Sequence, residues 1–480
     1  MENERDAIAG NIVVQIIGRM IVLVMALVTV KLISNYAGTE GTGYYNTIIT
    51  YLSFFITIAD FGLFSIGVRE ISKHPEKRRA LLNNIFTIRL ISALVVAIAA
   101  ITISQLTSYP TIIKQGVLIA SLFLFLNLVG SIFDMIFQTR LEMKKVAIAD
   151  VVAKVVSLSM LIAVIVFRLG FNWIIATVSL AAATTILVKY ILAADDEIPQ
   201  LGWDPEIAKN IMRLALPFGM IFILNNFYFK VDTLILFHYK GASQVGIYAV
   251  AYRVLETTMF AAAYLAYSLK PLLSSSINDD KEKAGHATSN GLTFMVSMSL
   301  ILCTICIPFS REIIIFLSNK DFVSGAPVII ILSLAAIFIY LNTMLSEVLI
   351  AKDARRYLLI MAITVLTFNI VSNLILIPKY SFYAAGAITL ASEFLIFCMG
   401  FIKARTIIPI NIDFWRISKL IFSAIVSIGI AYLFRSIGLY FMISIVISVM
   451  TYLALAYFID AMPKEMIRGY LSSLKEKWST

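Results

Sequence analysis

Long runs of apolar residues alternate with short polar segments along the whole chain. Each run is about 20 residues long, the length that an α-helix needs to cross the hydrocarbon core of a bilayer. A transmembrane β-barrel would instead show alternating strands of about ten residues. The pattern therefore predicts an all-α polytopic membrane protein with about fourteen transmembrane helices, near residues 11–34, 44–66, 85–107, 115–137, 146–167, 173–194, 211–235, 245–269, 289–308, 327–349, 358–378, 383–402, 416–434 and 439–459.

The composition excludes several other classes of protein. Of the 480 residues, 60% are hydrophobic and 14% are charged, whereas soluble domains have about 45–50% and about 25%. Charge this sparse excludes a disordered chain, and three cysteines are too few to stabilise a secreted protein of this length through disulfide bonds.

Basic residues are distributed unequally between the two sides of the predicted helices. Of the 39 Lys and Arg residues, 26 lie in or beside the segments on the side of the N-terminus. Because basic residues near helix ends resist translocation, this side is predicted to be cytoplasmic, with both termini there and the protein in the cytoplasmic (inner) membrane. The net charge of +10 then follows from topology, and no nucleic-acid partner is expected. The opposite side carries Lys114, Arg168, Lys240, Arg311, Lys320, Lys379 and Arg435.

Two sets of positions recur along the chain and indicate an internal duplication. At a spacing of 203 residues, Tyr36, Gly38, Gly43 and Tyr45 recur as Tyr239, Gly241, Gly246 and Tyr248. At a spacing of 211 residues, Lys144, Lys145, Phe171 and Ala176 recur as Arg355, Arg356, Phe382 and Ala387. We therefore expect Gly43 and Gly246 to occupy equivalent turns.

The duplication predicts the domain organisation. Residues 1–194 and 211–402 form two six-helix lobes, joined by a cytoplasmic linker at 195–210, and residues 403–480 form an appended helix pair with a cytoplasmic tail. Each lobe has an even number of helices, so the lobes share one orientation and are related by a pseudo-twofold axis along the membrane normal, a known arrangement in transporters.

Signatures of catalysis are missing from the sequence. It has no Gly-rich loop that ends in Lys-Ser or Lys-Thr, and its histidines match no metal-binding pattern. The Gly-rich stretch at 38–43 reads best as a turn, and Cys303 and Cys306 lie inside an apolar run without neighbouring ligands. We expect a protein that is not an enzyme and that uses neither a cofactor nor a metal.

Ionisable residues inside the predicted helices are the most informative positions, because a charge in the bilayer normally faces a cavity or a partner. Lys31, Asp134, Asp150 and Asp232 lie near helix ends, where side chains can reach the interface. The cations outnumber the acids among the deeper positions, which favours an anionic substrate such as a phosphate, a pyrophosphate or an acidic sugar. The candidate substrate-binding cations are Arg19, Arg89, Lys154, Lys230 and Arg253, and the candidate acids for ion coupling are Asp60, Glu256 and Glu393.

Two interpretations of Arg253 stay open. Arg253 and Glu256 are three residues apart on one face of a predicted helix, so they can form an ion pair. Alternatively, Arg253 binds the substrate in the central cavity.

Three stretches of sequence resemble the polysaccharide flippases, the Wzx-type proteins of the multidrug, oligosaccharidyl-lipid and polysaccharide exporter superfamily. In the third, Asn369, Asn373, Pro378, Gly386, Thr389 and Glu393 match the pattern of the family, whereas SFYAAG lacks a usual glycine. The stretches are KLISNYAGTEGTGYYN with ADFGLFSIGVRE, KVDTLILFHYKGASQVGIYAVAYRV, and NIVSNLILIPKYSFYAAGAITLASE.

The resemblance implies a function. A two-lobed fold with a polar central cavity would flip a polyprenyl-pyrophosphate-linked oligosaccharide, such as an O-antigen unit of lipopolysaccharide, to the outer face of the membrane. Alternating access of the two lobes would move the anionic head group while the polyprenyl tail stays among the membrane lipids. The enzymes implied beside it are glycosyltransferases and a polysaccharide polymerase.

Two other functions remain as alternatives. A multidrug or toxin cation antiporter of the same superfamily would have twelve core helices and a cavity dominated by acids. An integral-membrane glycosyltransferase or polymerase would usually carry a large external loop, which the hydropathy pattern does not show.

Overall fold

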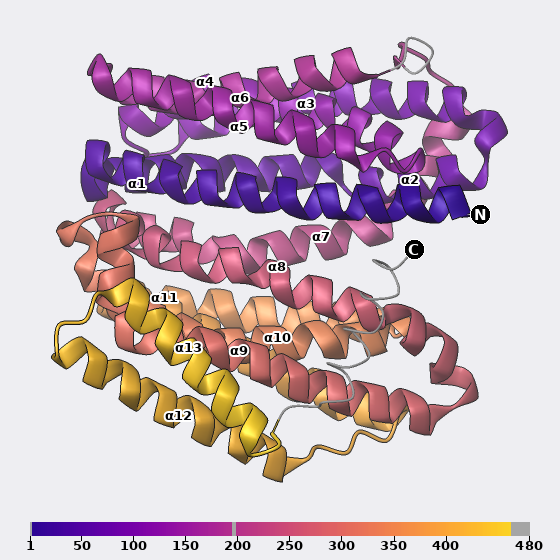
Figure 1. The fold of residues 1–480 in the computed structure, drawn as a ribbon. Helices are drawn as coiled ribbons and strands as arrows, with labels where there is room; N and C mark the ends of the chain where they lie inside the picture. The colour runs from indigo at the N-terminus through magenta and orange to yellow at the C-terminus, as the bar shows by residue number, and fades with distance from the viewer. Residues whose placement is uncertain (1, 194–197, 462–480) are drawn as a thin grey trace. The chain divides into compact units, whose positions relative to one another are not determined.

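In the computed structural model, residues 2–193 and 198–461 are described, and all of their regular structure is helical (Figure 1). This confirms the all-α fold class. Eleven helices in this part of the chain are long and apolar enough to cross a membrane. The helices are α1 (Glu2–Asp60), α2 (Leu63–Lys73), η1 (Pro75–Lys77), α3 (Arg78–Leu106), α4 (Thr111–Thr139), α5 (Met143–Val166), α6 (Phe171–Leu192), α7 (Pro205–Lys240), α8 (Ala242–Asp279), α9 (Lys281–Leu317), η3 (Lys320–Gly325), α10 (Ala326–Ala351), α11 (Arg355–Ile407), α12 (Phe414–Ser436) and α13 (Phe441–Phe458).

Helices α1 and α11 each contain two of the expected spans. They have 59 and 53 residues, and a straight helix of that length would measure about 80 Å or more, against a bilayer core of about 30 Å. Non-helical backbone interrupts them at Gly38 (φ 65°) and Ser381 (φ 54°). Figure 1 shows the N-terminus of α1 and the helix α2 at the same end of the first unit, so the chain reverses within α1. Each of the fourteen expected segments lies largely on a helix, with differences of one or two residues at several ends. The segment 44–66 is interrupted at residues 61–62, and residue 194 lies outside the described residues.

The chain divides into two compact units. The first contains Met1–Ala249 with Leu317–Asp321, and the second contains Val250–Phe316 with Phe322–Thr480. Helix α8 belongs to the first unit at its start and to the second along the rest of its length. The lobe boundaries inferred from the repeat stay a prediction.

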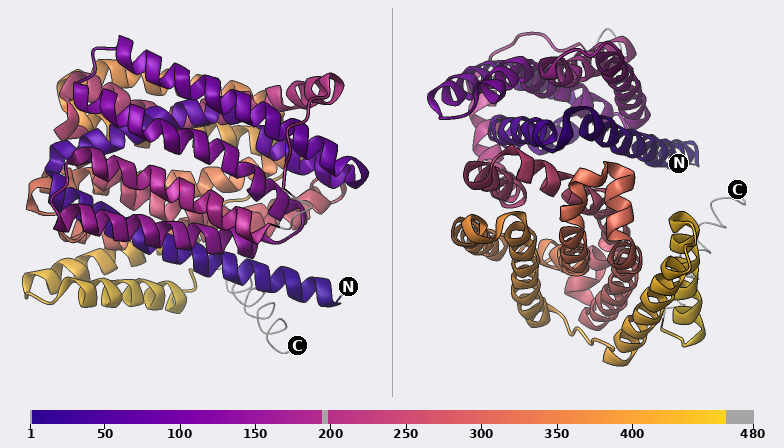
Figure 2. Two further views of the ribbon diagram at one scale, coloured as in Figure 1. Left: turned by 90° about the horizontal axis from the view of Figure 1, so that it is seen from above. Right: turned by 90° about the vertical axis from the view of Figure 1, so that its left-hand side faces the viewer.

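In the first unit, helices run side by side (Figure 2), and buried apolar side chains form clusters between them. One cluster gathers Leu63 of α2, Ile85 of α3, Ile132 and Ile136 of α4, and Ile211 of α7, each at most 1% exposed. Helix α4 packs against α1, α3 and α6. Burial of these side chains holds together the helices that carry the ionisable residues described below.

The backbone just before α7 is hydrogen-bonded to side chains of α3. The backbone N–H of Gly202 donates to the hydroxyl of Thr87 (3.0 Å), and that of Asp204 donates to the side chain of Asn84 (2.7 Å). The carboxylate of Asp204 accepts from the next two free N–H groups of α7 at 2.9 and 3.2 Å, and Pro205 opens the helix. A capping carboxylate followed by proline is a common start for a helix.

In the second unit, small residues allow the last two helices to approach closely. The hydroxyl of Ser427 in α12 donates to the carbonyl of Ser448 in α13 (2.5 Å). The hydroxyl of Tyr452 in α13 donates to the carbonyl of Ser297 in α9 (3.0 Å). Small and hydroxyl-bearing residues are typical of helix contacts inside membranes. The fully buried serines of this pair are Ser423, Ser427, Ser444 and Ser448.

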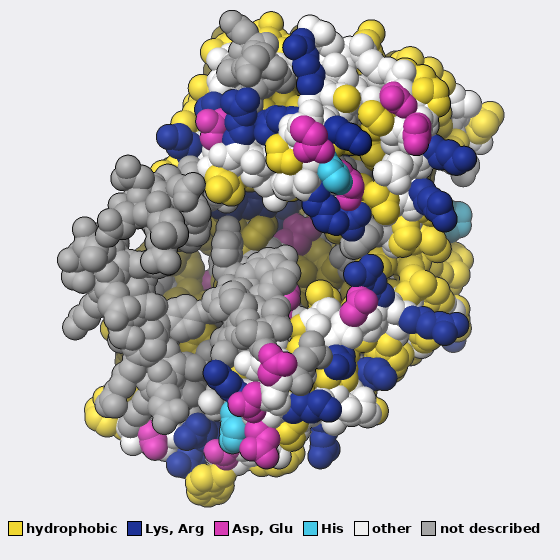
Figure 3. Space-filling view, turned by 90° about the vertical axis from the view of Figure 1, so that its right-hand side faces the viewer, with side chains coloured by type: hydrophobic (Ala, Val, Ile, Leu, Met, Phe, Trp, Pro, Cys, Tyr) yellow, Lys and Arg dark blue, Asp and Glu magenta, His cyan; other side chains and the backbone are white. Residues whose placement is uncertain are grey.

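The outer faces of the helices and their ends differ in composition. Large apolar side chains are exposed along the spans, among them Leu94 (54%), Ile98 (56%) and Val446 (60%). Such faces suit contact with lipid rather than water. Lys and Arg side chains gather instead over the end of the first unit that carries α2 and the start of α3 (Figure 3).

Candidate functional site

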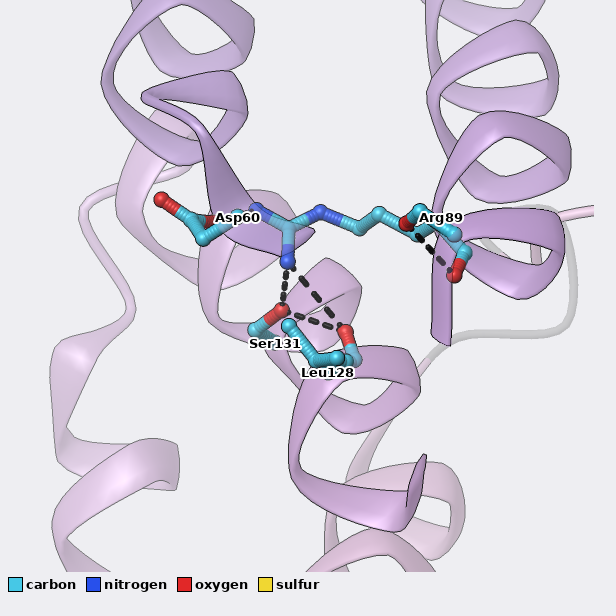
Figure 4. A network of polar contacts seen from close by, with 5 residues as sticks. Asp60, Arg89, Leu128 and Ser131 are labelled. Carbon is cyan, nitrogen blue, oxygen red and sulfur yellow. Dashed lines mark hydrogen bonds and ion pairs between the residues drawn. The ribbon is translucent and has the colours of Figure 1, made fainter. Parts of the chain in front are cut away.

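A buried ion pair joins α1 and α3 in the first unit. Arg89 is 1% exposed, and its Nη2 lies 2.6 Å from Oδ1 of Asp60, near the end of α1. The other terminal nitrogen donates to the carbonyl of Leu128 (3.2 Å) and to the hydroxyl of Ser131, both in α4 (Figure 4). Three helices therefore meet at one guanidinium group.

This arrangement changes the interpretation of two predicted residues. Arg89 was expected among the cavity cations and Asp60 among the acids for ion coupling, but the structure brings them together as partners. A buried arginine is tolerable only when an anion and hydrogen-bond acceptors compensate for the water that it has lost. The contacts with Asp60 and α4 supply this compensation, so they hold Arg89 in the helix packing.

A second set of charges lies on α1, α4, α5 and α6 of the same unit. Lys189 is 5% exposed, and its Nζ lies 2.6 Å from Oδ1 of Asp134. Asp150 interacts electrostatically with Lys189, with Asp134 and with Arg19. Sequence reasoning missed Lys189, which lies in the last turn of α6. Asp134 was interpreted as reaching the interface, whereas it pairs with this buried cation.

Asp232 in α7 is also buried, which corrects the expectation that it reaches the interface. It is 3% exposed, and its Oδ2 accepts a hydrogen bond from the phenol of Tyr248 in α8 (2.6 Å). Its Oδ1 accepts from the backbone N–H of Thr233 (2.6 Å). Tyr248 is one of the repeated tyrosines, so this repeat position has a partner inside the membrane span.

The second unit contains the remaining predicted acids. Arg253 Nη1 lies 2.9 Å from Oε2 of Glu256, with about a third of each side chain exposed. The intrahelical pair therefore forms. Glu393 in α11 is 2% exposed and accepts from the side-chain amide of Asn342 in α10 (2.8 Å). Asn342 was missed, because an amide inside an apolar run carries no charge to mark it.

The other three predicted cations are less buried than Arg89. Arg19 in α1 is exposed, and Lys154 in α5 and Lys230 in α7 are half-buried. Whether they line a common cavity with Arg253 stays a prediction.

The repeated glycines meet each other in the first unit. A Cβ at Gly43 would lie 1.7 Å from the carbonyl oxygen of Ala242, and a Cβ at Gly246 would lie 2.0 Å from that of Thr39. Thr39 and Ala242 are themselves 203 residues apart, so the contact is reciprocal. The positive φ angles occur at the other repeated pair, Gly38 (65°) and Gly241 (78°). Gly43 and Gly246 are thus required for close approach inside helices, and the turns lie five residues earlier.

Among the described residues, no group of three or more His, Cys, Asp or Glu side chains is arranged to hold a metal ion. Cys303 and Cys306 are buried free thiols in α9, and the thiol of Cys303 donates to the carbonyl of Ser333 (3.4 Å). These cysteines belong to the helix packing.

Comparison with protein families gives two matches. Residues 8–277, more than half of the chain, match the family described as polysaccharide biosynthesis protein. Residues 217–375 match the MatE family. An uncharacterized membrane protein of Methanocaldococcus jannaschii is 23% identical over 385 residues, which cover 74% of this chain and 75% of that protein.

Solved structures share the fold at low sequence identity. The lipid II flippase MurJ in an inward closed conformation superimposes with a TM-score of 0.76 at 16% identity, covering 93% of this chain and 98% of that chain. A multidrug resistance MATE family transporter, inward-facing, gives a TM-score of 0.68 at 13% identity over 82% and 98% of the two chains. A transporter from Pyrococcus furiosus, whose binding pocket is described as having reversed polarity, gives 0.60 at 13% identity over 84% and 96%.

The match to the polysaccharide biosynthesis family covers the first two of the three stretches that resemble the flippases. The structural matches extend over most of the chain. The descriptions of these structures name transporters and a flippase. The chain is a multi-pass membrane protein that belongs to the polysaccharide biosynthesis protein family.

Proposed function

We propose that this protein flips a polyprenyl-pyrophosphate-linked oligosaccharide from the cytoplasmic to the outer face of the cytoplasmic membrane. The observation that carries the proposal is the match to the polysaccharide biosynthesis family over residues 8–277. Both termini are cytoplasmic, as the distribution of basic residues predicts. The substrate is made by glycosyltransferases on the inner face and is used by a polymerase on the outer face.

The charged residues support an anionic substrate. A pyrophosphate and its sugars cannot enter the hydrocarbon core, whereas the polyprenyl chain can stay in it. Cations in a water-filled path lower the barrier for the head group. We assign this role to Arg19, Lys154, Lys230 and Arg253, which are exposed or half-buried. We leave out Arg89, because it is 1% exposed.

The pairing of the acids bears on the multidrug alternative. A cation exporter needs carboxylates that can exchange between the drug and a coupling ion. Asp60 and Glu256 have cationic partners within 2.6 and 2.9 Å, and Glu393 accepts from Asn342. These contacts favour an anionic substrate over a cationic drug.

A genetic test separates the two functions. In cells that lack the gene, we expect loss of the surface polysaccharide and accumulation of the lipid-linked oligosaccharide on the cytoplasmic side. The wild-type gene should restore the polysaccharide, and resistance to cationic dyes should not change. A normal surface polysaccharide together with a new sensitivity to cationic dyes would instead support the drug exporter.

A further inference from the structure

An apolar cavity lies in the second unit between α9, α10, the second span of α11 and the start of α12. Its volume is about 240 Å³, and one water molecule needs about 10–15 Å³ on the same measure. The cavity therefore has room for a long apolar group. Its lining includes Leu292, Val296, Phe338, Phe397, Ile417 and Ile421.

The few polar groups at the cavity have partners in the protein. The hydroxyl of Ser289 donates to the carbonyl of Gly285 (2.8 Å) and accepts from the backbone N–H of Asn411 (3.0 Å). The hydroxyl of Thr293 donates to the carbonyl of Ser289 (3.0 Å). Water is stable in a cavity only where it finds about two to four polar partners. The lining offers few, so the cavity suits a hydrocarbon chain better than water.

The connection between α11 and α12 contributes Ile412 to the lining, and α12 leaves part of the lining exposed. A Cβ at Gly285 would lie 2.2 Å from the carbonyl oxygen of Pro409, so this connection packs directly on α9. Along α12, Phe414 is 77% exposed and Ile421 is 44% exposed, although both line the cavity. A chain can therefore enter sideways from the bilayer.

Basic residues outnumber acids along the chain beside this end of the cavity. Within ten residues of the connection at 408–413, the cations are Lys403, Arg405, Arg416 and Lys419, and the acid is Asp413. Lys419 lies 5.7 Å from the ring centre of Trp415, in the first turn of α12. Basic groups and aromatic residues at a helix end are typical of the level of lipid head groups, and they attract anionic lipids.

We propose that the cavity holds one acyl chain of an anionic membrane lipid from the leaflet on this side. The acyl chain makes van der Waals contacts with the lining atoms, which these atoms would lack in an empty cavity. The lipid then links the appended helix α12 to α9, α10 and α11. This binding does not depend on the transported substrate, so its test needs no transport.

The test uses vesicles of phosphatidylethanolamine and phosphatidylglycerol that contain a phosphatidylglycerol probe with a photoreactive group in the middle of one chain. After illumination, mass spectrometry of the purified full-length protein should find the label on lining residues such as Phe338, Phe397 and Ile417. Ile417→Trp fills the cavity and should lower this labelling at least fivefold. The matched control Ile425→Trp places the same ring at an exposed position of α12 and should leave the labelling unchanged.

A second variant, Leu341→Phe, narrows the cavity from α10 and serves if Ile417→Trp does not fold. Equal labelling of the lining in a folded cavity-filling variant and in the wild type would overturn the proposal. Equal labelling by a phosphatidylcholine probe with the same chain would refute the anionic head group. Loss of the label on addition of polyprenyl phosphate, but not of unlabelled phosphatidylglycerol, would show that the cavity serves the substrate chain instead.

Discussion

Two cations inside the membrane spans of the first unit are almost fully buried and paired. Arg89 and Lys189 each have a carboxylate oxygen within 2.6 Å, although their partners lie 29 and 55 residues away along the chain. Removing one member of a buried pair leaves the other charge without compensation, and this costs more than the pair itself contributes. At the scale of single residues, these pairs hold helices together.

We predict that Asp60→Asn destabilises the protein by about 3 kcal/mol, because it leaves the guanidinium group of Arg89 buried without its anion. Asp353→Asn is the matched control, since Asp353 pairs with Arg355 at the surface and is 72% exposed. Exposed pairs contribute about 0–1 kcal/mol. Unfolding in detergent measures both effects, and equal stability of the two variants would contradict a structural role for the Arg89 pair.

Exchanging Arg253 and Glu256 preserves an ion pair and moves the cation by about 4.5 Å along α8. If Arg253 contacts the pyrophosphate, the doubly exchanged protein should reach the membrane and fail to restore surface polysaccharide. Arg253→Lys should retain part of the activity where charge alone matters. Full complementation by the exchanged protein would limit Arg253 to pairing with Glu256.

The sequence identified Arg89 and Asp60 as unusual but did not show that they are partners. Hydropathy marks a charge inside an apolar run, whereas pairing depends on which helix faces meet. Lys189 and Asp232 were missed or misjudged for a related reason. The position of Asp232 near an expected helix end predicts access to the interface, but tertiary packing buries its side chain, as it buries that of Lys189.

At the scale of helices, the apolar pattern located the spans well and their ends less well. Helix α3 begins at Arg78, before the expected start at residue 85, because the polar turn beyond the hydrocarbon core is also helical. Helix α2 was not expected as a separate element. It buries Leu63, Ile66 and Ile71 on one face only, and the backbone breaks before it at Phe61 and Gly62, whose φ angles are 41° and 77°.

The reciprocal glycine contact predicts matched defects. Gly43→Ala and Gly246→Ala should both reduce the yield of folded protein strongly and to a similar extent, because each methyl group would overlap a backbone carbonyl. Gly429→Ala in α12 is the control. Nothing lies within 4 Å of its Cβ position, so the change should be neutral or slightly stabilising. Size-exclusion profiles in detergent measure the yield. Gly43→Ala and Gly246→Ala profiles like that of Gly429→Ala would contradict the close contact.

At the scale of the whole molecule, topology and function were predictable to different degrees. The number and length of apolar runs determine a multi-pass helical protein almost without regard to side-chain detail. The choice of substrate depends on a few polar side chains, and the hydropathy pattern does not show in which direction these side chains point. For example, hydropathy does not distinguish Arg89 from Lys230, whereas in the structure Arg89 is buried and Lys230 is half-buried.

Topology reporters test the predicted orientation. Fusions after Glu76 and Glu282 should report the cytoplasm, and a fusion after Lys320 should report the outside, because basic residues concentrate on the first side. An external signal at Glu282 would break the expected six-plus-six arrangement.

Flipping by the purified protein tests the proposed function most directly. The full-length protein is placed in vesicles that carry a fluorescent polyprenyl-pyrophosphate-linked oligosaccharide, and an impermeant quencher is added outside. We expect the inner-leaflet fraction to become accessible with the wild-type protein but to stay protected with Lys230→Glu or Arg253→Glu, while a fluorescent zwitterionic phospholipid stays protected throughout. Oligosaccharide lipid that stays protected with the wild-type protein, or that crosses as fast with both variants, would contradict transport of an anionic head group by these cations.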